Sequence, residues 1–96
     1  MHEELENSLI ELIKISESIL SSDDLEGVLH YLEHGEYEMS FEGLVIEFYT
    51  TGKYPANFNY EKWRKLAILF GLDKESLFDE KFWDKFNEWG VAYSHR

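Results

Sequence analysis

The chain has no cysteine, a single proline and no long apolar run. Without cysteine it can form neither disulfide bonds nor thiolate metal sites. The longest uninterrupted apolar stretch runs from Leu66 to Phe70, far short of the ~20 residues that a membrane-spanning helix requires. The first residues are acidic, whereas a signal peptide begins with a basic segment. We therefore expect a cytoplasmic protein that does not insert into membranes.

Basic residues are almost absent from the first half of the chain. Residues 1–52 contain 13 Asp and Glu against one Lys, a net charge of −12, whereas residues 53–96 contain 7 acids against 8 bases, a net charge of +1. Binding to nucleic acid requires clustered Lys and Arg, so this composition excludes it. The acidic half is either an ordinary solvated surface or a face shaped for a basic partner.

The length and the aromatic content indicate one folded domain. Residues 1–96 are enough to bury a core without disulfides or structural metals. Aromatic residues make up 17% of the chain, which argues against disorder in spite of the high charge. We therefore treat residues 1–96 as a single helical domain.

Apolar residues recur at helical spacing throughout, and no alternating strand pattern extends over a useful length. The expected helices run from Glu3 to about Ser21, from Leu25 to Gly35, from Glu36 to Gly52, from Asn59 to Gly71 and from Asp79 to Gly90. The sequence predicts an all-α fold, a compact bundle of five to six helices.

Local signals set the ends of these helices. Asp23 with Glu26 three residues later resembles a capping box, and Asn59 is a favourable N-cap residue. Asp73 is expected to cap a short turn through Leu77 and Phe78. The tail from Val91 to Arg96 is expected to fray.

The helix between Gly35 and Gly52 is apolar on two sides. One broad stripe consists of Tyr37, Phe41, Leu44, Val45 and Phe48. The roughly opposite side carries Met39 and Ile46, with Glu38, Glu42 and Tyr49 beside them. Such a helix either lies at the centre of the fold or reserves one side for a partner.

Residues His30 to His34 read His-Tyr-Leu-Glu-His, the H-x-x-E-H pattern of one class of zinc peptidases. Two histidines one turn apart can share Zn²⁺, with the glutamate as general base. Because Leu25, Val28, Leu29 and Leu32 form the inward face of this helix, the two histidines should point to solvent. No third ligand is evident, so we expect no metal site and no cofactor.

Other catalytic signatures are missing too. There is no Gly-x-Ser-x-Gly elbow and no phosphate-binding glycine loop. The carboxylates of Glu38 and Glu42, one turn apart, are expected on an exposed face rather than in a pocket that would raise a pKa. The chain is therefore expected not to be an enzyme.

The aromatic residues of the second half are expected mainly in the core, and the placement of Trp83 and Tyr93 is left open. The expected core residues are Trp63, Phe70, Phe78, Phe82, Phe86 and Trp89.

The segment from Leu32 to Leu44, Leu-Glu-His-Gly-Glu-Tyr-Glu-Met-Ser-Phe-Glu-Gly-Leu, resembles one found in small bacterial immunity proteins of the MafI and contact-dependent growth inhibition (CdiI) type. In those proteins a helical hairpin meets a Gly-Glu turn, followed by a helix whose Phe/Ala-Glu-x-Leu run packs inward. The resemblance covers about residues 23–50, half of the chain.

The resemblance implies an immunity protein that binds and neutralises a cognate toxin domain. Many such toxins are nucleases with basic grooves, and the immunity protein blocks the active site or the surface used for substrate. The implied partner is the C-terminal toxin domain, bound by a monomer in a one-to-one complex. The charge of residues 1–52 agrees with this, since an acidic protein complements a basic groove.

The helix side opposite the apolar stripe is the candidate toxin-binding face. Its members are Glu38, Met39, Glu42, Ile46 and Tyr49, with Glu33 at the adjoining turn. A different explanation for Glu42 is that it ties its helix to a neighbouring element through Lys or Tyr. The alternative function is an acidic adaptor, or a mimic of nucleic acid that regulates a basic partner. A small metal-dependent hydrolase would rest on His30, Glu33 and His34 alone.

Overall fold

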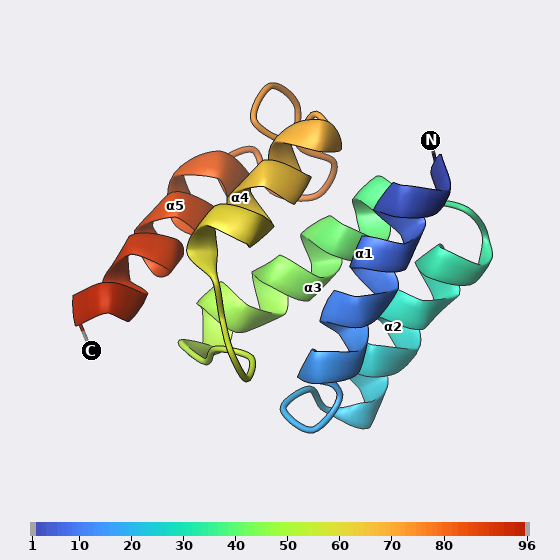
Figure 1. Ribbon diagram of the computed structural model, residues 1–96, viewed down its shortest axis with the longest axis horizontal. Coiled ribbons are helices and arrows are strands. Elements are labelled where there is room, and N and C mark those ends of the chain that lie inside the picture. The colour runs from blue at the N-terminus through green and yellow to red at the C-terminus, as the bar shows by residue number, and fades with distance from the viewer. Residues whose placement is uncertain (1, 96) are drawn as a thin grey trace.

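The computed structural model describes residues 2–95, a stretch that contains helices and turns and no β-strand. Its elements are α1 (His2–Ser16), α2 (Ser22–Glu33), α3 (Tyr37–Thr51), α4 (Tyr60–Leu69), α5 (Phe82–Ala92) and the 3-10 helix η1 (Tyr93–His95). The all-α class and the number of helices agree with the prediction. Helix α3 runs through the middle of the molecule, with α1 and α2 on one side and α4 and α5 on the other (Figure 1).

Helix α3 is the central element because it is buried on more than one side. Its predicted apolar stripe is largely in the core, with Phe41, Leu44, Val45 and Phe48 all buried. Ser40, which lies outside that stripe, is buried as well and donates a hydrogen bond of 2.9 Å to the carbonyl oxygen of Val28 on α2. The central position, one of the two expected for a helix that is apolar on two sides, is the one observed.

Helix α1 is shorter than predicted. It ends at Ser16 rather than near Ser21, and the buried Ser16 hydroxyl donates to the Leu12 carbonyl at 2.7 Å. Ile19 and Leu20 follow in a turn but still pack against the core. Their inward placement preserves the helical spacing of apolar residues, so the pattern alone could not reveal that the helix had ended.

The cap of α2 also differs from the prediction. Its N-cap is Ser21, whose Oγ accepts a hydrogen bond of 3.2 Å from the Asp24 backbone N–H. The predicted capping box at Asp23 is therefore wrong. The cap of α4 is the predicted one, with Asn59 Oδ1 accepting from the Lys62 N–H at 3.2 Å. Gly52 ends α3 in the left-handed conformation, at a φ of 69°, which side chains with a Cβ disfavour.

The second half of the chain packs through aromatic rings. Trp89 stacks on Tyr54 with ring centroids 5.0 Å apart and contacts Phe48 and Phe58. Its indole N–H donates to the Lys53 carbonyl at 2.8 Å, and Tyr54 donates its hydroxyl to the Trp89 carbonyl at 2.6 Å. The proline loop that leads into α4 is therefore held against α5 by polar and aromatic contacts together.

The C-terminal segment is ordered as far as it is described. Helix α5 continues past Gly90 to Ala92, and η1 follows to His95. Tyr93 packs on Tyr54 and Phe58, with ring centroids 4.9 and 5.0 Å apart. The predicted fraying from Val91 is therefore wrong for residues 91–95, while residue 96 lies outside the described part. Gly90 does not end the helix; it provides room for the ring of Tyr60.

Candidate protein-binding surface

Glu42, at the middle of the predicted toxin-binding face, has an exposed fraction of 0%. Its Oε1 accepts a hydrogen bond of 2.6 Å from the Leu77 N–H, and its Oε2 accepts from the Phe78 N–H at 2.8 Å and from residue 79 at 3.0 Å. These bonds replace the water that the carboxylate loses on burial. The prediction that Glu42 lies on an exposed face is therefore wrong, and its tie to a neighbouring element runs through backbone N–H groups rather than through Lys or Tyr.

A second polar contact joins α3 to the α4–α5 loop, which we define as residues 71–81. Tyr49 donates its hydroxyl to Asp79 Oδ2 at 2.8 Å, and Lys85 Nζ donates to the same oxygen at 3.0 Å. The Lys81 backbone N–H donates to Asp79 Oδ1, also at 3.0 Å. Tyr49 is only partly exposed, and its hydroxyl is engaged within the molecule.

These hydrogen bonds shift the acidity of both partners. The backbone N–H of Lys81, the Tyr49 hydroxyl and the Lys85 ammonium together lower the pKa of Asp79 to about 2. Burial, followed by the hydrogen bond and the negative charge of Asp79, raises the pKa of Tyr49 above its ordinary value. Both shifts favour the arrangement seen here, an anionic Asp79 that accepts from a neutral tyrosine.

The α4–α5 loop holds two large apolar side chains at the surface. Leu77 is 49% exposed and Phe78 is 47% exposed. The Phe78 ring contacts the Tyr31 ring of α2, with centroids 5.6 Å apart. The prediction that Phe78 belongs to the core is therefore wrong. The short turn that was predicted to be capped by Asp73 and to run through Leu77 and Phe78 differs from the observed backbone, in which residues 71–74 form a turn and residues 77 and 78 form a bend. Glu42 binds the backbone N–H groups of Leu77 and Phe78, and the side chains of both residues face solvent.

A depression of about 340 Å³ adjoins Leu77. Its lining consists of Glu38 of α3, Phe70 and four loop residues, namely Gly71, Leu72, Glu75 and Leu77. Glu38 and Glu75 are both exposed, and no Lys or Arg is among the lining residues that the structure describes. The depression therefore combines an apolar floor with two carboxylates.

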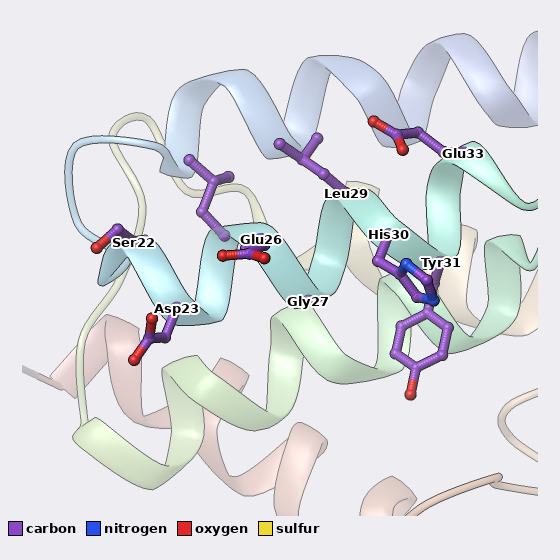
Figure 2. Close-up of a pocket in the computed structure, with 9 residues that line it drawn as sticks. Ser22, Asp23, Glu26, Gly27, Leu29, His30, Tyr31 and Glu33 are labelled. Atoms are coloured by element: carbon purple, nitrogen blue, oxygen red, sulfur yellow. The ribbon is translucent and has the colours of Figure 1, made fainter.

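The remaining predicted interface residues differ in their exposure and surroundings. Met39 and Ile46 are partly exposed, and Ile46 packs against the core. Glu33 lies on α2, on the lining of a different and larger depression of about 780 Å³ (Figure 2). Among the six predicted residues, Glu38 is the exposed one beside the α4–α5 loop.

The two histidines of the H-x-x-E-H pattern are exposed, as predicted. Their ring centroids are 4.4 Å apart, and His34 Nδ1 lies 2.8 Å from the His30 carbonyl oxygen. Glu33 and His30 point to different sides of α2 (Figure 2), so the glutamate is not placed to serve a metal between the histidines. Within residues 2–95, no group of three His, Cys, Asp or Glu is arranged to hold a metal ion.

The acidic residues of the first half lie almost entirely at the surface. Of the 13 Asp and Glu in residues 1–52, Glu42 is the buried one and the other 12 are exposed or partly exposed. The acids of the α1–α2 hairpin are therefore surface residues and give this hairpin a negative charge. Glu47 is partly buried near Asp24, and the burial, the hydrogen bond and the charge of Asp24 all raise the pKa of Glu47.

Tyr31, Glu75, Leu77 and Phe78 are surface residues that sequence reasoning missed. The available signal was an apolar pair between polar neighbours, Ser76 and Asp79, in a segment without helical periodicity.

No family model, curated protein or solved structure matched the chain in our comparisons. Residues 2–95 also contain no helix with the length and apolar character needed to cross a membrane.

Proposed function

We propose that this chain is an immunity protein that binds a basic toxin domain, one acting as a nuclease, and blocks its active site or its substrate surface. The chain acts by binding and not by catalysis. The single observation that carries the proposal is the acidic surface of residues 1–52, in which 12 of 13 carboxylates are exposed or partly exposed. The resemblance of Leu32 to Leu44 to small immunity proteins points in the same direction.

The charge distribution suits the inhibition of a nuclease. Groups that bind a phosphate backbone are clustered Lys and Arg, and a carboxylate-rich surface competes with phosphate for the same cations. Opposite charges also accelerate the encounter of the two proteins and suppress binding to acidic partners. One ion pair of 3.7 Å, between Glu11 and Lys62, neutralises part of the charge of α1.

The test is the growth of cells that express the toxin domain encoded immediately beside the gene for this chain. Co-expression of the wild-type chain should restore growth, and the two proteins should co-purify in equal amounts. Failure of the wild type to protect or to co-purify would refute the proposal.

A matched pair of double variants tests the electrostatic part. Glu26→Lys with Glu33→Lys reverses two exposed acids on α2, and Glu61→Lys with Glu88→Lys makes the same charge change on the neutral half. The first pair should slow association and weaken protection more than the second. Equal effects would mean that net charge, rather than the acids of the α1–α2 hairpin, governs recognition.

The same surface supports one alternative, an acidic adaptor or nucleic-acid mimic that regulates a basic protein. A mimic recognises the spacing of charges rather than one cognate surface, so it would bind several unrelated basic proteins. Affinity that is similar for the neighbouring toxin domain and for an unrelated basic DNA-binding domain would favour this alternative. A large preference for the toxin domain would favour the immunity function.

A further inference from the structure

We infer that the outer surface of the α4–α5 loop is the apolar anchor of the toxin-binding surface, with Leu77 and Phe78 entering the partner and the carboxylates of Glu38 and Glu75 receiving one of its Arg or Lys side chains. This inference rests on the proposed function. The surface, which we call the loop anchor, consists of Tyr31, Glu38, Glu75, Leu77 and Phe78.

The α4–α5 loop is held in place by contacts within the chain itself. Three successive backbone N–H groups, those of residues 77 to 79, bind the buried carboxylate of Glu42. Asp79 is held in addition by the Tyr49 hydroxyl and the Lys85 ammonium. A loop that is already ordered loses little conformational freedom on binding, which leaves more of the contact energy as affinity.

The backbone of the loop exposes two large apolar side chains, a kind of residue that usually lies in the core. Leu77 and Phe78 are adjacent, large and apolar, and each leaves about half of its surface in water. Phe78 lies against Tyr31, so the apolar surface continues from the loop onto α2. Aromatic side chains at the centre of a contact that excludes water are the residues that most often dominate binding energy.

The charges beside Leu77 favour a basic side chain of the partner. Leu77 shares a depression of about 340 Å³ with Glu38 and Glu75, both exposed. An Arg or Lys side chain suits this combination, because its aliphatic stem packs on the apolar floor while its head meets the carboxylates. Lys74 and Lys81 belong to the same loop, but neither lines the depression. A second copy of this chain, at a net charge of −11, would bring further carboxylates to the site and is the poorer fit.

The experiment measures dissociation of the complex with the neighbouring toxin domain. Leu77→Ser with Phe78→Ser removes the apolar anchor and keeps the backbone N–H groups that bind Glu42. The control is Leu69→Ser with Val91→Ser, which removes two apolar side chains of similar exposure, 58% and 50%, at other sites. The loop pair should raise the dissociation rate about 30-fold or more, as expected for the loss of a binding hot spot, and the control should change it less than threefold.

The charges of the loop anchor are tested separately. Glu38→Lys with Glu75→Lys should weaken binding, chiefly by slowing association, more than Glu61→Lys with Glu88→Lys, which changes the net charge equally. Circular dichroism and the thermal midpoint of each variant alone must match the wild type within a few degrees, and Leu77→Ala with Phe78→Ala is a second anchor variant if the serine pair is unstable.

The outcomes separate the two proposals. If the wild type neither protects cells nor binds the toxin domain, the proposed function fails. If the wild type protects and binds, but the loop variants dissociate no faster than the control pair, the loop anchor is refuted while the proposed function stands. A concentrated wild-type sample that dimerises, with dimers abolished by Leu77→Ser and Phe78→Ser, would also overturn the inference, because a second copy would then be the occupant.

Discussion

The two halves of the molecule bury different kinds of side chains, and both pack against one shared helix, α3. The α1–α2 hairpin buries aliphatic residues such as Leu9, Leu12 and Val28 and carries the acidic surface. The α4–α5 half buries rings, including Trp63, Phe86 and Trp89, and is nearly neutral overall. Helix α3 lies between them (Figure 1). Its sequence matches this role, since Phe41 and Phe48 contact the rings of the second half.

The difference between the halves places most of the negative charge in the α1–α2 hairpin and most of the aromatic contacts in the α4–α5 half. Repulsion among like charges opposes folding, so a strongly acidic hairpin needs support from elsewhere. The aromatic half supplies a large apolar area in a compact form and adds polar ties such as the Trp89 indole bond to Lys53. We infer that the neutral half stabilises the fold while the acidic half is left free for recognition, with the α4–α5 loop at the junction.

The largest expected effect on stability comes from truncating a buried ring on α3, where the two halves meet. Phe41 is fully buried and contacts Trp63 and Phe70. Phe41→Ala should lower the free energy of unfolding by about 3–5 kcal/mol, measured by urea denaturation. The matched control is Phe78→Ala at the surface, which should change it by about 0.5 kcal/mol or less. Equal losses from the two variants would mean that the loop ring is as structural as the central one.

The next largest effect concerns two glutamates one turn apart on α3. Glu42→Ala leaves three loop N–H groups without their acceptor, and it should cost about 1–3 kcal/mol because part of the loop can rehydrate. Glu38→Ala, at an exposed position, should change the free energy of unfolding by about 0.5 kcal/mol or less. Hydrogen exchange of residues 77 to 79 should become faster in the first variant only. Unchanged exchange there would contradict the role assigned to Glu42.

A comparison of two glycines tests the packing of the aromatic half against that of the shared helix α3. A Cβ at Gly90 would overlap the Tyr60 ring, whereas a Cβ at Gly43 meets no atom within 4 Å. Gly90→Ala should therefore destabilise the protein by about 1–3 kcal/mol through overpacking. Gly43→Ala should stabilise it by about 0.4–1 kcal/mol by restricting the unfolded chain. Thermal denaturation of both variants distinguishes the two, and a stabilising Gly90→Ala would show that Tyr60 moves aside freely.

The smallest expected effect is a pH dependence at the loop. The pKa of Asp79 is about 2 in the folded protein, below its ordinary 3.8, so the folded state favours the anion. This contribution is present above about pH 4 and is lost as the pH falls toward 2. Tyr49→Phe, which removes one of the hydrogen bonds, should shift the Asp79 carboxyl titration upward by NMR. An unchanged titration would contradict the importance of this bond.

The sequence was sufficient for the helices because their apolar residues recur at a fixed spacing and their ends carry specific caps. Asn59 and Gly52 were identified correctly because the chemistry of a cap is local. The end of α1 was missed because Ile19 and Leu20 pack inward from a turn at the same spacing. The spacing of apolar residues cannot distinguish a helix that continues from a turn whose side chains also pack inward.

The candidate surface was less predictable, because exposure depends on contacts between distant segments. Glu42 belongs by spacing to the same helix side as Glu38, yet a loop more than thirty residues away covers it. The same contact turns Leu77 and Phe78 outward, although apolar residues are usually assigned to the core. Part of the predicted toxin-binding face of α3 is therefore buried against the α4–α5 loop. The exposed apolar side chains are those of Leu77 and Phe78 on that loop.

The most direct test of the central claim is the ionic-strength dependence of binding to the neighbouring toxin domain, measured by stopped flow for the wild type and for Glu26→Lys with Glu33→Lys. If the acidic half steers recognition, the association rate of the wild type should fall steeply as salt is raised while the dissociation rate changes little. The double variant should associate more slowly and depend less on salt. An association rate that is independent of salt and equal in the two proteins would contradict the account.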